Sequence, residues 1–406
     1  MAVSAFGAVG VSVGRGADVS SVYLDYNGSA PPDPQVVAAV AEALASGVGN
    51  ASASHGPGLM QAARVAQARE LVASLVGADP RGVVFTAGAT EANNLALRGL
   101  AEGRQGSGRT RLLVSSVEHA SVRKTARWLA SNGQVELDVI PVTPGGYVDV
   151  DAAAELIGPD VVAVSVMAAN SETGVLNDVA SVAALAHEAG AVMHCDATQA
   201  VGRVPFSLQS SGVDLVSLSA HKICGPGGVG ALVGDHRLLR SLEPVVHGGG
   251  HERGLRSGSL NVAGIVGFGV AAALAEQLRE AEAARLEVLR DRLVTELADR
   301  VGGLEQNGDV NRRLANTVNV RFVGADGEAV MANLDRLAVS SGSACSSGAI
   351  EPSPVLLAMG LEREAADQSL RLSLGRFTTD EEIDVAVEEL AAAVGFVRDM
   401  SCEVVR

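Results

Sequence analysis

The sequence predicts an α/β fold, in which a large domain on a mostly parallel sheet is followed along the chain by a smaller α+β domain. Two observations lead to this prediction. Short apolar runs that end in polar residues alternate with helical segments between residues 82 and 222, which is typical of buried parallel strands covered by helices. The chain has 406 residues, 47% of them hydrophobic, which is enough for one large or two moderate domains with a sizeable core.

The first elements precede the alternating region. The pattern predicts a short strand over residues 22–25, followed by the turn-rich segment "YNGSAPPDP". Pro34 then opens an amphipathic helix, since proline is favoured at the first helical position. After the loop "GNASASHGPG", a second helix is predicted over about residues 60–76.

The alternating region and the part of the chain beyond it supply the remaining elements. Strands are predicted at the start of "GVVFTAG", "RLLVSSVEHASV", "VVAVSVMAANSETG", "AVMHCDATQA" and "VDLVSLSAHK". In parallel sheets, the ligand site lies at the carboxyl ends of the strands. Beyond them, a long charged helix covers about 273–297, strands lie in "NTVNVRF", "AVSSG" and "SLRLSLG", and a helix over 380–399 closes the smaller domain.

Composition and charge exclude several classes of protein. The formal net charge of −16 argues against direct nucleic-acid binding, which needs a basic surface, and favours a basic protein partner. The longest apolar stretch, 262–275, is too short for the roughly 20 residues of a membrane helix. The N-terminus carries no positive charge before Arg15 and makes a poor secretory signal. We therefore expect a cytoplasmic protein without a membrane partner.

The four cysteines show no metal-binding spacing. Cys195, Cys224, Cys345 and Cys402 form no CxxC pair and no zinc-like pattern. In a reducing compartment disulfides are not expected either. We predict neither a metal site nor a disulfide.

Lysine is scarce, which draws attention to each one that is present. Of 31 lysines and arginines only Lys124 and Lys222 are lysines. A primary amine can lose its proton and form a Schiff base with a carbonyl, which arginine cannot do. A lysine retained in such a chain therefore suggests imine chemistry.

Lys222 follows a predicted strand, beside Ser219 and His221, and Asp196 ends the preceding strand. Pyridoxal phosphate (PLP) needs this set, because an amine holds its aldehyde and a carboxylate keeps its ring nitrogen protonated. "TAGATEANN" adds a Gly–Ala–Thr turn that enters a helix, a suitable phosphate site. Alone, Asp196 would more often be a helix cap and Lys222 a surface charge, but their combination favours a PLP site.

At this point the chain resembles the cysteine desulfurases of the NifS/IscS type, which are PLP enzymes of the class-V aminotransferase family. The resemblance extends from about residue 22 to residue 399. It rests on the order and spacing of ten motifs: "YLDYNGSAPP", "GNASASHGPG", "FTAGATEANN", "EHASV", "NSETGV", "DATQAVGR", "SAHKICGPGGVGAL", "GGGHERGLRSGSLN", "SSGSACSSG" and "RLSLGRFTT". It implies the PLP-dependent transferase fold type I, with a mostly parallel seven-stranded sheet in the large domain.

The resemblance implies roles around the ring of the cofactor. Lys222 would anchor the aldehyde, Asp196 would pair with the pyridine nitrogen, and Gln199 would contact the phenolic oxygen. His119 would stack on the ring and help to move protons. In isolation, His119 would more often be a satisfied core histidine, so its role depends on the motif context.

The resemblance also implies a phosphate site and a substrate site. Thr90, Ser219 and His221 would hold the phosphate, with Ser259 reaching in from the second subunit of a homodimer. Arg371, which alone would suggest a surface ion pair, would bind the substrate carboxylate. The expected cofactor-binding residues are Ala89, Thr90, His119, Ser171, Asp196, Gln199, Ser219, His221, Lys222 and Ser259, and the expected substrate-binding residues are Asn27, Ser171 and Arg371.

Cys345 lies in "SSGSACSSG", among serines and glycines that favour mobility. In the family, a loop cysteine takes the sulfur of L-cysteine as a persulfide, releases L-alanine and hands the sulfur to an acceptor protein. An incidental exposed thiol is the alternative, but exposed cysteines are liable to oxidation, so we assign Cys345 the catalytic role together with Lys222 and His119.

Two positions depart from the family pattern. Ser171 replaces the second asparagine of an Asn-Asn-Glu sequence, so its side chain is shorter and lacks an amide donor. At the substrate entrance, Asn27-Gly28-Ser29-Ala30-Pro31 replaces the usual Asn/His-Ala-Thr-Thr-Pro.

The expected division of the chain is a flexible extension over 1–21, a large PLP-binding domain over 34–276, and a small domain made of 22–33 and 277–406 that carries the cysteine loop. Alternative functions are a selenocysteine lyase, another class-V PLP enzyme, or a regulator without catalysis. An aminotransferase needs no mobile thiol, and a regulator would need a DNA-binding domain that about 20 N-terminal residues cannot supply. The sulfur acceptor is left open between iron–sulfur assembly, tRNA thiolation, DNA phosphorothioation and thio-natural-product synthesis.

Overall fold

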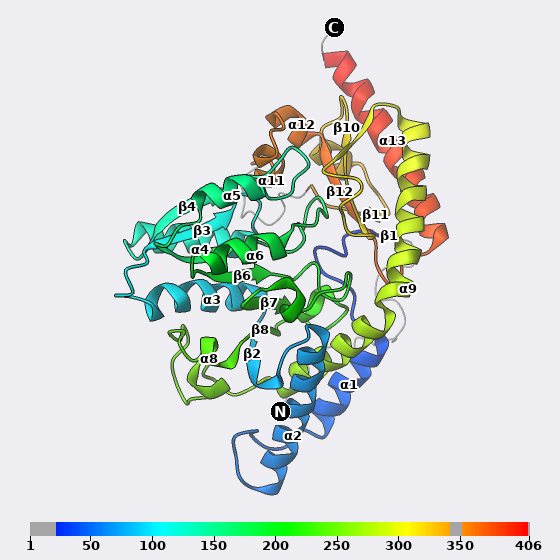
Figure 1. The fold of residues 1–406 in the computed structure, drawn as a ribbon. Helices are drawn as coiled ribbons and strands as arrows, with labels where there is room; N and C mark the ends of the chain where they lie inside the picture. The colour runs from blue at the N-terminus through cyan, green and yellow to red at the C-terminus, as the bar shows by residue number, and fades with distance from the viewer. Residues whose placement is uncertain (1–21, 342–350, 405–406) are drawn as a thin grey trace, which may run out of the picture.

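A computed structural model describes residues 22–341 and 351–404, with residues 402–404 described by their backbone alone. Figure 1 shows a broad sheet with helices on both faces, and a second, smaller group of strands flanked by two long helices. The predicted α/β fold with a mostly parallel sheet is confirmed. The predicted extension over residues 1–21 lies outside the described residues.

The larger sheet has seven strands in the order β2-β8-β7-β6-β5-β3-β4. Strand β8 runs antiparallel to both of its neighbours, and the other six strands share one direction. Their carboxyl ends therefore meet at one edge. The strands are β2 (Val83–Thr86), β3 (Arg111–Ser115), β4 (Glu136–Ile140), β5 (Val161–Ser165), β6 (Val192–Asp196), β7 (Leu215–Ser219) and β8 (Gly230–Gly234).

Two hydrophobic clusters cover the two faces of this sheet, because successive side chains of a strand point to opposite faces. Val192 of β6 packs with helices α3 and α4, whereas Met193 and Cys195 pack with α2, α6 and α9. The helices and 3-10 turns around the sheet are α1 (Pro34–Ala45), α2 (Gly56–Leu75), α3 (Ala89–Gly103), α4 (Ala120–Ser131), α5 (Val150–Leu156), α6 (Val179–Glu188), α7 (Leu208–Ser211), α8 (His236–Leu239), α9 (Val262–Val301), η1 (Pro80–Gly82), η2 (Ala220–Lys222) and η3 (Glu252–Gly254).

The second unit has its own core. The antiparallel strands β9, β10 and β12 pack Val320, Phe322 and Leu372 against Leu293 of α9 and Leu390 of α13. The short strand β1 pairs in parallel with β11, so the first described residues belong to this unit. Its elements are β1 (Val22–Tyr23), β9 (Leu304–Asn307), β10 (Thr317–Phe322), α10 (Gly327–Ala332), β11 (Leu337–Ala338), α11 (Pro354–Ala358), α12 (Arg363–Asp367), β12 (Ser369–Ser373) and α13 (Asp380–Val404).

Residues 24–33 connect the two units. The amide of Tyr26 donates to Ser373 O at 3.1 Å, whereas the amide of Ala30 donates to His221 O at 2.9 Å. One short stretch is therefore bonded both to β12 and to the η2 turn that follows β7. The domain boundaries at residues 33/34 and 276/277 stay a prediction.

Two helices are longer than the sequence pattern indicates. Helix α9 begins at Val262, not near residue 273, and is capped by Asn261, whose side chain accepts from Gly264 N. Its apolar first half packs against α1 and α2 so closely that a Cβ on Gly269 would lie 2.8 Å from Ala68 Cα. Because it is buried on several faces, this half lacks the polar stripe that marks an amphipathic helix. Helix α2 likewise begins at Gly56, with His55 as its cap.

By length and composition, α9 is the one helix among the described residues that is able to cross a membrane. Half of its most apolar window is buried inside the protein, where it packs against α1 and α2. Burial of this kind is the usual setting of a core helix.

Candidate functional site

The predicted site residues meet at the carboxyl edge of the large sheet. Asp196 is the last residue of β6, and Lys222 ends the η2 turn that follows β7. His119 lies in the turn after β3 and caps helix α4. Hydrogen bonds through Asn93 and Ser121 connect Asp196 to His119.

Asp196 is held by two donors. It is 4% exposed. Its Oδ1 accepts from Thr198 N at 3.0 Å, and its Oδ2 accepts from Asn93 Nδ2 at 2.7 Å. Hydrogen-bond donors to a carboxylate fix its orientation, so the Asp196 side chain is held in place at the strand end.

His119 is partly buried at the start of α4. Its Nδ1 accepts from Ser121 N at 3.1 Å and lies 2.8 Å from Ser121 Oγ. Burial lowers the pKa of His119, and Lys222 and Arg123 lower it further while Asp196 opposes them. The ring is therefore neutral at pH 7.

Lys222 faces the N-terminal segment. Its Nζ donates to the carbonyl oxygens of Asn27 and Gly28, the latter at 2.6 Å. Gln199 Nε2 also donates to Asn27 O, at 3.0 Å, and Gln199 Oε1 accepts from Arg203 Nη1. The amine of Lys222 and the amide of Gln199 thus converge on one backbone carbonyl.

Asn27 is 1% exposed, and its side-chain amide is fully engaged. Nδ2 donates to Ser171 O at 3.2 Å and to Thr317 Oγ1 at 2.9 Å, while Oδ1 accepts from Arg203 and Asn316. With two donors and two acceptor positions used, the side chain binds protein groups. Its expected contact with substrate stays a prediction.

The start of α3 has the features of an anion site. The helix is capped by Gly88, which has φ 153° and supplies no side-chain cap. Among the described residues, the amides of Ala89 and Thr90 therefore have no side-chain acceptor. A Cβ on Gly88 would meet only Ser219 Oγ within 4 Å, at 3.8 Å. Uncapped amides at a helix N-terminus bind phosphate readily.

His221 follows Ser219 by two residues, in the η2 turn. Its Nδ1 is 3.1 Å from Ser29 Oγ. Burial lowers the pKa of His221 to about 4, with further contributions from Lys222 and Arg203. Like His119, it is a neutral imidazole near pH 7.

Arg371 is 5% exposed and oriented by two partners. Its Nη2 forms an ion pair with Asp25 Oδ1 at 2.6 Å, and its Nη1 donates to Ser171 O at 3.0 Å. Its Nε is buried and has no hydrogen-bond partner among the described residues. A buried guanidinium with a spare donor suits a carboxylate ligand.

Two predicted residues are not joined to this cluster. Ser259 is exposed in a segment that Arg256 fastens to Glu91 of α3 at 2.8 Å. None of the hydrogen bonds between described residues links Ser259 to the other site residues. Cys345 lies outside the described residues, although Ser340 before it exchanges backbone hydrogen bonds with Arg371.

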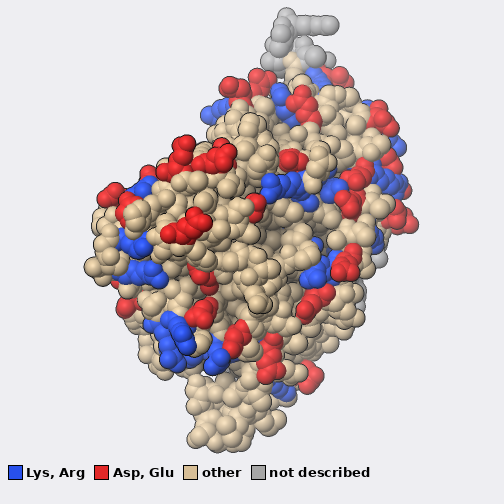
Figure 2. Space-filling view, in the orientation of Figure 1, with Lys and Arg blue, Asp and Glu red and all other residues tan. Residues whose placement is uncertain are grey.

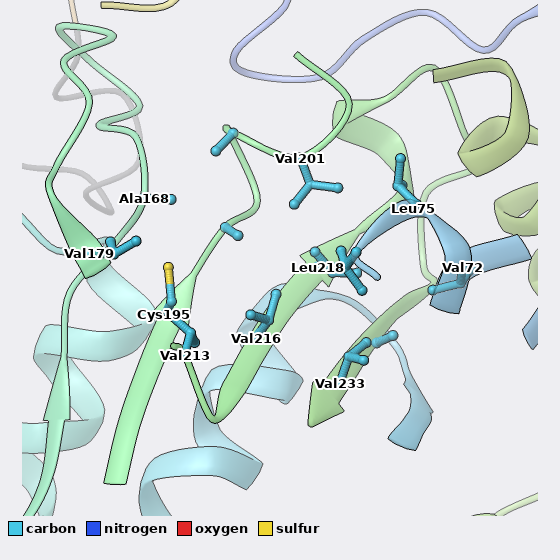
Figure 3. Packing of buried hydrophobic residues seen from close by; sticks show 14 of the residues in the cluster. Val72, Leu75, Ala168, Val179, Cys195, Val201, Val213, Val216, Leu218 and Val233 are labelled. Atoms are coloured by element: carbon cyan, nitrogen blue, oxygen red, sulfur yellow. The ribbon is translucent and has the colours of Figure 1, made fainter. Parts of the chain in front are cut away.

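Cys195 and Cys224 are buried and free of disulfide bonds. Figure 3 shows Cys195 among Val179, Val213 and Val216, and it is fully buried. Burial raises the pKa of Cys195 and raises that of Cys224 to about 11. Neither thiol is set up to ionise near neutral pH.

Sequence reasoning missed several polar residues that the structure brings to the site. Asn93 and Arg203 lie in the quoted motifs "FTAGATEANN" and "DATQAVGR", and Asp25 lies in "YLDYNGSAPP". Each of the three side chains bonds a residue far away in the sequence. The sequence therefore shows the motif but does not indicate which residue the side chain contacts.

The residues present fit PLP. An uncapped helix start beside Ser219 suits its phosphate, and Lys222 and Asp196 supply the amine and the carboxylate that the cofactor requires. The donor set therefore matches the cofactor that the sequence predicts.

A sequence model of the Aminotransferase class-V family matches residues 22–385. The chain belongs to this family, whose members generally use PLP. Among its relatives, a protein named cysteine desulfurase from Frankia sp. (strain EuIK1) is 46% identical over 389 residues, which cover 94% of this chain and 93% of the relative. Within the class-V family, the chain is therefore a member of the cysteine desulfurases.

Solved structures agree with this placement. A NifS-like protein superposes with a TM-score of 0.86 at 32% identity, over 93% of this chain and all of the other. A structure described as SspA in complex with cysteine superposes with a TM-score of 0.76 at 30% identity, over 88% of this chain and all of the other. The predicted resemblance to the NifS/IscS type is confirmed.

Proposed function

We propose that this enzyme binds PLP, removes the sulfur of L-cysteine, releases L-alanine and carries the sulfur as a persulfide on Cys345 to an acceptor protein. The observation that carries the proposal is the grouping of Lys222, Asp196 and His119 at the carboxyl edge of the sheet, beside an uncapped helix start. PLP, when bound, supplies an electron sink for the bonds of the substrate amino acid.

The protein groups divide the work of binding. Lys222 would anchor the cofactor aldehyde, and Asp196 would keep the ring nitrogen protonated. The amides of Ala89 and Thr90 at the uncapped start of α3 would hold the phosphate, together with Ser219 and His221. Gln199 and Ser171 border the ring as implied by the family resemblance.

Arg371 binds the α-carboxylate of L-cysteine. The support is its buried position and the partnerless Nε. Asp25 and the Ser171 carbonyl hold the other guanidinium nitrogens at 2.6 and 3.0 Å. A planar donor that is already oriented loses little entropy when the substrate binds.

Cys345 receives the sulfur. Its thiolate forms a bond to the substrate sulfur as the carbon–sulfur bond breaks. The electron pair of that bond stays with the carbon, which takes a proton and becomes the methyl group of alanine. The described neighbours of this segment lie at the site: Ser340 bonds to Arg371, and Ser353 Oγ donates to Glu172, next to Ser171.

A homodimer completes the phosphate site through Ser259 of the second subunit. Support comes from the exposure of Ser259 and from an apolar tip made of Leu44, Val48, Leu59 and Met60, which are 58–75% exposed. Figure 2 shows this lower tip, over α2, without charged side chains. Exposed large apolar side chains that gather in one region mark interaction sites. The proposed setting is the cytoplasm.

The test compares Lys222→Ala and Cys345→Ser with the control Cys195→Ser. Lys222→Ala should lose the borohydride-reducible link to PLP and all turnover. Cys345→Ser should keep bound PLP but release almost no alanine and show no added sulfur by intact-protein mass after L-cysteine, because serine cannot carry sulfane sulfur. Cys195→Ser should keep most activity. Persulfide on the Cys345→Ser protein would refute the proposal.

A further inference from the structure

Asn93, on the second turn of α3, connects the anion that faces the cofactor ring with the histidine of the site. It is fully buried, and its Nδ2 donates both to Asp196 Oδ2 at 2.7 Å and to Ser121 Oγ at 2.8 Å. Its Oδ1 is buried and has no partner within the described parts of the chain. Both amide hydrogens are therefore used.

The orientation of this amide follows from its partners. An ionised carboxylate can only accept hydrogen bonds, so the group next to Asp196 must be the NH₂ end of Asn93. Rotating the amide by half a turn would place its oxygen against the Asp196 carboxylate and lose that hydrogen bond. Asn93 is consequently a donor to Ser121 Oγ as well.

This direction sets the hydroxyl of Ser121. Since Ser121 Oγ accepts from Asn93, its own hydrogen is free to point at His119 Nδ1, 2.8 Å away. The backbone N–H of Ser121 donates to the same Nδ1 at 3.1 Å, as the cap of α4. A ring nitrogen that faces two donors cannot itself carry a proton.

We propose that the chain Asn93–Ser121 locks His119 in the tautomer with its proton on Nε2, so that the ring presents a donor N–H, not a lone pair, to the reaction. Among the described residues no hydrogen bond engages Nε2. Asn93 and Ser121 are positioning residues that act through His119. The lock itself requires no cofactor, but its use in catalysis rests on the proposed function.

The surroundings of the ring favour the same state. Asp196 is the one group facing His119 that raises its pKa, and burial, Lys222 and Arg123 lower it. The first turn of α4 adds the positive end of a helix dipole, which disfavours a cation at this place. Protonation of Nδ1 would also break two donor contacts. A neutral donor is the form that the fold maintains.

The experiment is ¹⁵N NMR of the histidine ring nitrogens in the apoenzyme across pH, since the lock is a property of the chain alone. The chain has eight histidines, so the spectrum of His119→Gln assigns the signal. The wild type should show Nε2–H with unprotonated Nδ1. Ser121→Ala should raise the pKa of His119 by about half to one pH unit, the equivalent of one neutral hydrogen bond.

Three further variants separate a lock from general damage. Ser121→Thr keeps the hydroxyl and should restore the wild-type titration. Asn93→Ala should shift it in the same direction as Ser121→Ala. Asn94→Ala is the matched control, since Asn94 bonds Thr90 O and Thr125 and should leave the His119 signal in place. In the holoenzyme, Ser121→Ala should move the acidic limb of the kcat profile upward by the same interval.

The possible results distinguish a failure of the proposed tautomer from a failure of the proposed function. A wild-type His119 with its proton on Nδ1 would overturn the proposal, as would a Ser121→Ala signal that titrates like the wild type. An enzyme that fails to turn over L-cysteine but shows the locked tautomer would refute the proposed function and leave the lock standing.

Discussion

Glu118 is a buried carboxyl whose charge state ties folding stability to pH. It is 1% exposed, and its Oε1 accepts from Ser115 Oγ at 2.6 Å and from Met167 N at 2.7 Å. Its Oε2 is buried and has no partner among the described residues. Burial raises the pKa of Glu118 to about 8, with Asp196 adding to the shift and Arg123 and the two donors opposing it.

The direction of the effect follows from that pKa. The unfolded carboxyl titrates near 4.5, whereas the folded one holds its proton up to about pH 8. Stability from this group is therefore fully present below pH 4.5 and is lost as the pH rises toward 8. At about 1.4 kcal/mol per pH unit, the complete loss is about 5 kcal/mol, of which about 3 kcal/mol falls between pH 5.5 and 8.

The perturbation is Glu118→Gln, which has the shape of the protonated acid and does not titrate. Its amide group meets the same surroundings at every pH, so any packing cost is constant. The free energy of unfolding of the variant minus that of the wild type should rise by about 3 kcal/mol between pH 5.5 and 8.

Urea unfolding of both proteins at several pH values measures this difference. Glu136→Gln, at an exposed position of β4, removes the same charge and should follow the wild type in parallel. A Glu118→Gln curve that also runs parallel to the wild type would show that Glu118 is ionised in the folded protein, which would refute the reasoning.

Two further predictions concern arginines that pair with carboxylates. Arg371→Lys should raise KM for L-cysteine about 10- to 100-fold with a smaller change in kcat, because one ammonium cannot serve Asp25 and a bidentate substrate together; an unchanged KM in steady-state kinetics would place the carboxylate elsewhere. Glu252→Ala should lower the free energy of unfolding by about 3 kcal/mol, since it leaves Arg69 as an unpaired charge. Asp79→Ala removes the partner of Arg81 in an exposed ion pair and should change the urea midpoint less than Glu252→Ala does. Equal changes in the two variants would contradict the prediction for Glu252.

The sequence predicted that Asp196 and Lys222 lie at the same edge of the sheet, because their positions after two predicted parallel strands are sufficient for this conclusion. Both follow apolar runs, and parallel strands bring their carboxyl ends to one edge. It did not predict the contacts of Asn93, because Ser121 and Asp196 lie 28 and 103 residues further along the chain. A contact of that separation depends on how helices pack on the sheet, which periodicity does not encode.

The sequence prediction placed the start of α9 at about residue 273, whereas the helix begins at Val262. This error also comes from packing that periodicity does not encode. A predicted helix depends on a polar face, and residues 262–275 have none because α1 and α2 pack against them. The charged second half, by contrast, shows the amphipathic pattern that the prediction used. The roles of Ser259 and Cys345 stay predictions, the first because no second subunit is present and the second because it lies outside the described residues.

One departure from the family pattern has a structural cause. Residue 28 is glycine where alanine is usual, and a Cβ at this position would overlap Asp25 Oδ2. That carboxylate is held by Arg371 at 2.6 Å. The carbonyl of Gly28 also accepts from Lys222 Nζ at 2.6 Å. The turn therefore places the partner of Arg371 and an acceptor for Lys222 within four residues of one another. The absent side chain thereby lets a single turn orient both cationic groups of the site, and Gly28 belongs with Asp25 to the support of Arg371.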